Sequence, residues 1–337
     1  MRSLKDVVDD TASRTGFSGV VRVDRAGTTE LSRAYGLADR AHRVPNTVET
    51  QFAVASGSKT LTALAVMGLV ERGILELGTT ARSLLGDDLP LIADDVTIEH
   101  LLSHRSGIGD YFDDDGDVSD YLLPVPPARL VSPEDYLPIL DGYPTVFPAG
   151  TDFLYCNGAF VVLALLAQRA SGVPFHDLVR QRVFEPAGLT ATDYLRSDDL
   201  PGDAAIGWVE MNGAWRTNVH HLPVIGGGDG GAYTTTADML RLWKAFFAGR
   251  IVPLELVSEM VKVRSTQEDD DSYGLGLWLD PHTDAVELEG YDPGISFRSV
   301  HQPSRQVTWT IISNWSDGAW PLADRMAHLL GTSGLDG

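Results

Sequence analysis

The order of apolar and polar residues predicts strands near both ends of the chain. Residues 18–25 and 30–36 alternate around a turn at Ala26–Gly27, which predicts a β-hairpin at the edge of a sheet, without catalytic residues. Strand patterns return in the last third of the chain, over residues 275–279, 286–288, 294–301 and 306–314. Helical periodicity flanks them, over residues 1–15, 236–248 and 320–330. Both termini are therefore expected to build one lobe.

The middle of the chain, from about residue 61 to residue 220, has a mainly helical pattern interrupted by long loops. The predicted fold class is therefore α/β (α+β). One α/β domain is expected from residues 1–60 and 221–337, and a mainly helical insert domain from residues 61–220. We expect the active site between the two domains.

The most apolar helix pattern follows Ser56-Gly57-Ser58-Lys59-Thr60 directly, and Gly73 predicts its end. A helix that is apolar on every face is buried, so Lys59 in its first turn should be buried too. Ser56 and Lys59 are three residues apart and lie on one helix face. Because a desolvated lysine amine can take the proton of a serine hydroxyl, this pair predicts nucleophilic catalysis by Ser56.

The spacing of this pair is weaker evidence than its burial. The chain has only four lysines, and only Lys59 has a serine three residues before it. With so few lysines, a chance match of this kind still arises roughly once in four such sequences. Ser58 is the rival hydroxyl, but it is adjacent to Lys59 and therefore faces another way. Ser56 is the better candidate.

Composition and charge exclude several classes of partner. The 337 residues include 26 basic and 47 acidic side chains, for a net charge of −21. Nucleic acids and anionic membranes repel such a chain, so we expect neither as a partner. The single cysteine, Cys156, excludes an internal disulfide and a cysteine-based metal cage. Residues 1–10 are charged and contain no apolar run, so no secretion signal is visible and we expect a cytoplasmic protein.

Three further segments contain residue types that suggest a site. His104 lies near a glycine-rich turn, and we interpret it as a structural hydrogen-bonding residue. Asp113–Asp117 resembles a calcium loop but lacks the required glycine and glutamate, so a solvated loop is favoured. Gly226–Gly231 is interpreted as a place where backbone passes close to backbone or ligand.

With Ser56-x-x-Lys59 followed by Tyr155-x-Asn157, the sequence resembles the serine β-lactamase and penicillin-binding-protein superfamily. Within it, the sequence is most similar to the branch of class C β-lactamases, D-alanyl-D-alanine peptidases and family VIII carboxylesterases. Further segments agree with the same family, over residues 100–107, 148–157, 184–189 and 230–238. The resemblance implies a β-lactamase-like fold, with an antiparallel sheet flanked by helices beside a mainly helical domain.

The resemblance also implies a role for each motif residue. Ser56 would be the acylated nucleophile and Lys59 its proton acceptor or electrostatic partner. Tyr155 would be the second acid/base group and would deliver a proton to the leaving group. Asn157 would hold the lysine and the carbonyl side of the substrate. No metal or organic cofactor is implied.

The third motif of the family, which usually has Lys or His, a small residue and then Gly, is placed at Glu289-Gly290-Tyr291. The N–H of Asp292, together with that of Ser56, would then form the oxyanion hole. A glutamate at this place would repel a substrate carboxylate unless Arg298 faces the site and compensates. Esters or amides without a carboxylate are therefore favoured over β-lactams and peptidoglycan stems.

The expected function is a serine hydrolase, a carboxylesterase that forms an acyl-enzyme on Ser56 with small esters. One alternative is a β-lactamase or a D-amino-acid peptidase of the D-Ala-D-Ala type. A second is a non-catalytic family member that binds an acyl or peptide ligand. The expected partner is a small-molecule ester or amide, and the sequence leaves the oligomeric state open.

Overall fold

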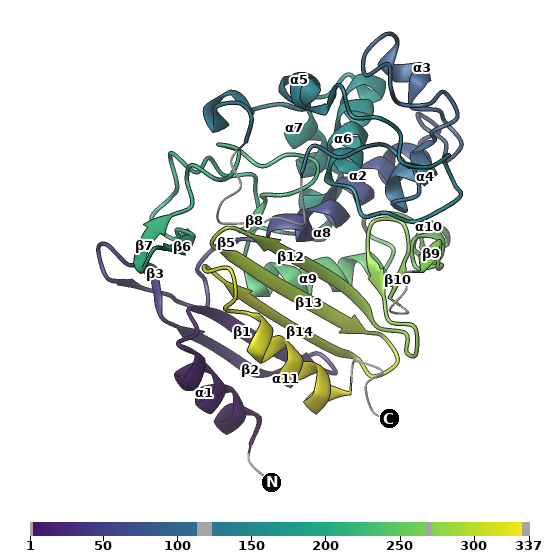
Figure 1. Cartoon of the computed structure of the whole chain (residues 1–337). Helices are drawn as coiled ribbons and strands as arrows, with labels where there is room; N and C mark the ends of the chain where they lie inside the picture. The colour runs from purple at the N-terminus through teal and green to yellow at the C-terminus, as the bar shows by residue number, and fades with distance from the viewer. Residues whose placement is uncertain (1–2, 113–122, 267–270, 332–337) are drawn as a thin grey trace.

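A computed structural model describes residues 3–112, 123–266 and 271–331 (Figure 1). Its centre is an eight-stranded antiparallel sheet with the strand order β2-β1-β14-β13-β12-β11-β10-β9. The five long strands come from both ends of the chain: β1 (Gly19–Arg25), β2 (Thr28–Tyr35), β12 (Val286–Asp292), β13 (Ile295–Gln302) and β14 (Val307–Ser313). The other three are short: β9 (Ser265–Thr266), β10 (Ser272–Tyr273) and β11 (Trp278–Leu279).

Two terminal helices cover one face of this sheet. They are α1 (Leu4–Thr15) and α11 (Trp320–Leu330), and they lie side by side in Figure 1. Each has one apolar stripe, and these stripes pack on the sheet in a core that includes Val8, Val21 and Trp309. This face therefore supports the sheet, and Trp320 of α11 contacts the ring of Tyr291 on β12.

The other face packs against the helical part of the chain. The apolar helix α2 (Lys59–Glu71) lies at its centre, beside α6 (Asn157–Ser171), and both belong to the largest hydrophobic core. Around this pair are α3 (Arg82–Leu85), α4 (Ile98–Leu102), α5 (Leu137–Leu140), α7 (Phe175–Val179) and α8 (Glu185–Ala187). Helix α9 (Thr236–Phe247) packs on β1 and β14, and α10 (Leu254–Met260) packs on α9. A 3₁₀ turn, η1 (Ala55–Ser58), leads into α2 at the boundary with the sheet.

The structure agrees with most of the predicted long elements and corrects two segments. Residues 275–279 were expected to be a strand, but only Trp278–Leu279 pair with β12. Gly276 explains the difference, because it has φ +83° and a Cβ there would lie 2.2 Å from the Cβ of Ala63. The predicted helical segment also contains a hairpin, β6 (Trp208–Met211) and β7 (Ala214–Thr217).

The β-lactamase-like fold class is confirmed, whereas the domain boundaries at residues 60 and 220 stay a prediction. The expected edge hairpin is present, with β2 at the edge and β1 between β2 and β14. Asp113–Asp117 lies outside the described residues. In the described ranges no single helix is long and apolar enough to cross a membrane; the bent pair Asn157–Ser171 and Phe175–Ala187 meets that test by length and composition only.

Candidate active site

Ser56 lies in the 3₁₀ turn η1, where the chain passes from the sheet into α2. The preceding residue, Ala55, has φ +46°, a left-handed conformation that is costly for a residue with a Cβ. Backbone hydrogen bonds hold this turn from both sides, from Val54 N–H to the Ala232 carbonyl and from Gly231 N–H to the Ala55 carbonyl. The strained turn therefore presents Ser56 at the cavity in one fixed position.

Lys59 is the centre of the hydrogen-bond network at this turn. Its side chain is buried, and its Nζ lies 2.8 Å from Ser56 Oγ, 2.7 Å from Asn157 Oδ1 and 2.8 Å from the Asp229 carbonyl oxygen. The rival Ser58 hydroxyl instead donates to the Ala55 carbonyl and accepts from Ala232 N–H. The structure thus brings Ser56, and not Ser58, to the lysine.

Asn157 is held by the N-terminus of α6, of which it is the first residue. The Asp110 carboxylate accepts from the N–H groups of Asn157 at 2.5 Å and Gly158 at 2.9 Å. A carboxylate at a helix N-terminus satisfies free N–H groups and complements the helix dipole. Asp110 is therefore a positioning residue for Asn157, and the sequence contained no signal for it.

Tyr155 lines the same cavity beside Lys59. The Lys59 Nζ lies 4.8 Å from the centroid of the Tyr155 ring. The ring stacks on Trp278, with centroids 6.1 Å apart, and it also contacts the tilted ring of His104, with centroids 4.4 Å apart. These contacts fix the direction of the Tyr155 ring, and so of the hydroxyl that it carries.

His104 is fully buried behind Tyr155. Its Nδ1 accepts a hydrogen bond from Cys156 N–H, and burial together with the charge of Lys59 lowers its pKa well below the usual value. The imidazole is therefore neutral. This matches the structural role predicted for it and leaves Lys59 as the base nearest to Ser56.

The glycine-rich segment Gly226–Gly231 passes along the other side of Lys59. The Asp229 carbonyl accepts from Lys59, and the Gly228 carbonyl accepts from Thr62 Oγ1 at 2.6 Å. The Asp229 carboxylate accepts from Tyr111 Oη at 2.5 Å, and burial raises its pKa. The segment thus lies close to the backbone and side chains of α2, as its glycines predicted.

Strand β12 closes the site from the sheet side. Gly290 lies directly against η1, since a Cβ there would be 2.1 Å from the Val54 carbonyl oxygen and 2.9 Å from Gly57 N. Only glycine permits so close an approach. The short strand β11 pairs with β12 only at Val286 and Glu287, so among the described residues the rest of this strand edge has no strand beside it. The open edge of β12 therefore borders the cavity.

The register of β12 and β13 corrects one expected role. Asp292 is opposite Ile295 across the two-residue turn Pro293–Gly294. Two residues that flank such a turn exchange both hydrogen bonds, so the Asp292 N–H points to β13 and is not the second oxyanion donor. Along a strand, successive N–H groups alternate in direction, and the Tyr291 N–H therefore points to the open edge.

Glu289 and Arg298 lie opposite each other on β12 and β13. The Arg298 guanidinium forms ion pairs with Glu289 at 2.6 Å and with Glu287 at 2.7 Å. Burial is the main cause that raises the pKa of Glu287 to about 7. Because one guanidinium is shared by two carboxylates, Arg298 offsets the charge of Glu289 only in part.

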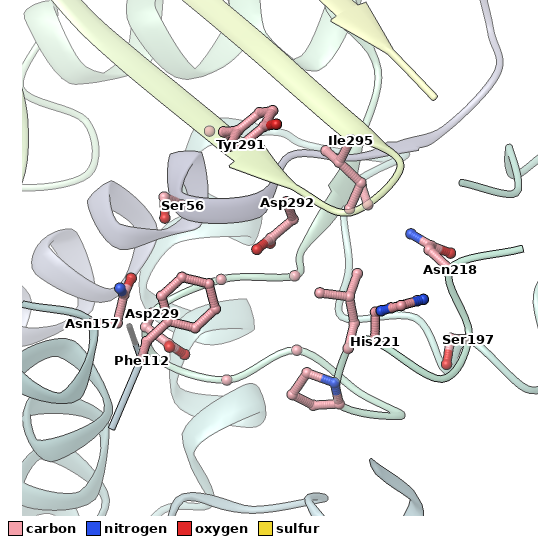
Figure 2. Close-up of a pocket in the computed structure, with 18 of the residues that line it drawn as sticks. Ser56, Phe112, Asn157, Ser197, Asn218, His221, Asp229, Tyr291, Asp292 and Ile295 are labelled. Carbon is pink, nitrogen blue, oxygen red and sulfur yellow. The ribbon is translucent and has the colours of Figure 1, made fainter. Parts of the chain in front are cut away.

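These elements enclose a cavity of about 490 Å³, and Figure 2 shows it extending from Ser56 and Asn157 to Asn218 and Ser197. Its walls include Tyr155, Trp278 and the predicted site residues of β12. Asp292 points into it from the end of the strand. All the predicted site residues except Lys59 are in its lining, and Lys59 lies just beneath Ser56.

The comparisons with known proteins agree with this geometry. The Beta-lactamase family profile matches residues 4–331. The solved penicillin-binding protein of Bacillus halodurans is 34% identical, covers 98% of this chain and 100% of its own, and superposes with a TM-score of 0.89. Esterase EstB of Burkholderia gladioli is 34% identical over 57% of this chain and 51% of its own length. A D-aminopeptidase of Brucella ovis is 30% identical over 68% of this chain and 42% of its own length. The chain therefore belongs to the beta-lactamase family of serine hydrolases.

Proposed function

We propose that this protein is a carboxylesterase that hydrolyses small esters through an acyl-enzyme on Ser56. The observation that carries the proposal is the set of three contacts of Lys59 Nζ. The oxygens of Asn157 and Asp229 in this set can only accept hydrogen bonds. In the reactive form that we propose, the amine is neutral and donates its two hydrogens to them, and its lone pair then faces the Ser56 hydroxyl. This arrangement suits an amine that removes the serine proton.

The proposed reaction has two halves. In the first, Ser56 Oγ attacks the ester carbonyl carbon while its proton passes to Lys59, and the N–H groups of Ser56 and Tyr291 stabilise the negative carbonyl oxygen. Tyr155 then protonates the leaving alcohol as the C–O bond breaks. In the second half, water attacks the acyl-enzyme and gives a proton to Tyr155, and Lys59 returns its proton to Ser56 Oγ as the bond from Ser56 to the acyl carbon breaks and the acid is released.

The charge at β12 favours esters over β-lactams. A β-lactam or a peptidoglycan stem presents a carboxylate close to the reacting bond, and Glu289 lies at the cavity with only a shared arginine to balance it. A neutral ester has no such group. A D-amino-acid peptidase is the second candidate function, because Glu289 would not repel a free amine on the acyl side of the substrate.

The first test is intact-mass spectrometry after incubation with a fluorophosphonate, with p-nitrophenyl acetate and nitrocefin turnover measured alongside. We expect one adduct on the wild type, ester turnover well above nitrocefin turnover, and loss of both adduct and turnover in Ser56→Ala. The control is Ser258→Ala, an exposed serine on α10. A folded wild type that gives neither adduct nor turnover would favour a non-catalytic, ligand-binding protein instead.

A further inference from the structure

A second cavity, of about 200 Å³, lies at the other end of α2 from Lys59. Its walls include the C-terminal end of α2, the π-helical turn η4 (Arg180–Phe184) and the loop from α9 to α10. Each of these walls contributes one arginine: Arg72, Arg182 and Arg250, in that order. Lys59 and Arg72 stand at the two ends of α2, about 20 Å apart along the helix axis. This cavity is therefore separate from the site at Lys59.

The three guanidinium groups are unpaired in the part of the chain that the structure describes. There, none of them forms an ion pair or a side-chain hydrogen bond, and the Nε of Arg182 is buried without a hydrogen-bond partner. Arg180, on the same helical turn, instead pairs with Asp177 at 2.7 Å and with Asp193 at 3.0 Å. Acidic side chains are thus within reach of this turn, but Arg182 lines the cavity without one. A buried donor in this state costs free energy, which a bound acceptor would recover.

Arg182 is held in place by the helix beneath it. The side chain is half-buried, and a Cβ at Gly68 of α2 would lie 3.8 Å from the Cβ and Cδ of Arg182, so the stem of this arginine lies across the glycine. Its backbone belongs to a π-helical turn, a rare form that is frequent at functional sites. Because the stem is packed, less side-chain freedom is lost when the guanidinium binds a ligand.

The charge balance of this cavity favours an anion. Among the described residues its lining has one carboxylate, Glu71, against three guanidinium groups. The C-terminal end of α2 adds about −0.5 charge, which leaves a balance of about +1.5 in a protein with a net charge of −21. Guanidinium groups bind the paired oxygens of phosphates and carboxylates. A phosphate monoester has a charge of about −1.5 to −2 and three acceptor oxygens, so it matches this balance better than a single carboxylate does.

We propose that this cavity binds the phosphate group of a small phosphorylated molecule, and that Arg182 holds it together with Arg72 and Arg250. Binding there is independent of the reaction proposed for Ser56, because the linings of the two cavities share no residue. Loss of one guanidinium should weaken binding about tenfold to hundredfold, as the loss of a charged hydrogen bond does.

The test is isothermal titration calorimetry of the full chain with sodium phosphate, sodium pyrophosphate and sodium acetate at one ionic strength. We expect one site per chain for phosphate and for pyrophosphate, and at least about tenfold weaker binding of acetate, which has a single charge and two oxygens. Ser56→Ala should bind pyrophosphate as tightly as the wild type does. Equal affinities for acetate and phosphate, or loss of binding in a folded Ser56→Ala, would overturn the proposal.

Three variants test the arginines. Arg182→Gln and Arg250→Gln should each weaken pyrophosphate binding about tenfold or more. Arg216→Gln removes the same charge from an exposed position on β7 and should leave binding unchanged. Circular dichroism verifies that each variant is folded, and the exposed Arg250 decides the test if Arg182→Gln is not. No binding to the wild type, or binding that survives in the folded arginine variants and so reflects an adventitious ion only, contradicts the assignment. Neither result bears on the esterase proposed for Ser56.

Discussion

The start of α2 and the open edge of β12 meet at one cavity, but their polar groups are bound very differently. Lys59 is only 2% exposed and makes three short hydrogen bonds. On β12, Tyr291 is 42% exposed and Glu289 shares one arginine with Glu287. A buried network tolerates little change, whereas an open edge can carry other side chains at small cost. We infer that α2 sets the type of reaction and β12 selects the substrate.

The largest effect is expected for Lys59→Met, which keeps the length and volume of the side chain. The variant removes the base beside Ser56, so kcat/KM for p-nitrophenyl acetate should fall by about 10³-fold. Circular dichroism should still show a folded protein. Lys244→Met on the exposed side of α9 is the matched control. Activity within tenfold of the wild type would exclude Lys59 as the base.

The next largest effect is expected for Tyr155→Phe. The ring and its stacking on Trp278 remain, but the hydroxyl that protonates the leaving group is lost. We expect kcat to fall by about 10²-fold, and more for poor leaving groups than for p-nitrophenol. Tyr143→Phe, at a residue that is 37% exposed, is the control. An equal loss for good and poor leaving groups would contradict the role of a general acid.

On β12, Glu289→Lys should change selectivity more than rate. The substitution replaces the carboxylate that pairs with Arg298 by an amine at a residue of the cavity lining, and so adds positive charge for a substrate carboxylate. The ratio of nitrocefin to p-nitrophenyl acetate turnover should rise severalfold. Glu210→Lys, on the exposed side of β6, makes the same charge change elsewhere. An unchanged ratio would show that Glu289 does not face the carboxylate position.

The smallest effect concerns stability and pH. Glu287 titrates at about 7 in the folded protein against 4.5 for a free side chain, so folding favours its protonated form. This contribution to stability is complete below pH 4.5 and is lost as pH rises through 7. Between pH 5 and 8 the wild type should therefore lose about 1 to 3 kcal/mol of unfolding free energy relative to Glu287→Gln. Urea unfolding at both pH values measures it, and parallel curves for the two proteins would contradict the shift.

The contrast between the start of α2 and the edge of β12 also explains which site residues could be predicted from the sequence. Ser56, Lys59, Tyr155 and Asn157 stand at the starts of two apolar helices, and such starts are visible in a single sequence. Asp110, Tyr111 and Trp278 come from loops and a two-residue strand, so their contacts depend on the tertiary fold. The strand register moves the proposed oxyanion donor from Asp292 to Tyr291, because the direction of an N–H follows from register, which a sequence does not display.

The pairing of β1 with β14 also determines when during synthesis the protein can become active. Gly19 is opposite Ser313, so the sheet closes only after residue 313 has left the ribosome. The Ser56 turn and α2 are made early, but β12, with the Tyr291 N–H and Gly290, comes among the last residues. A nascent chain therefore holds the serine and the lysine before the proposed oxyanion donor of β12 is in place, and the proposed site is complete only after strands β12 to β14 have folded.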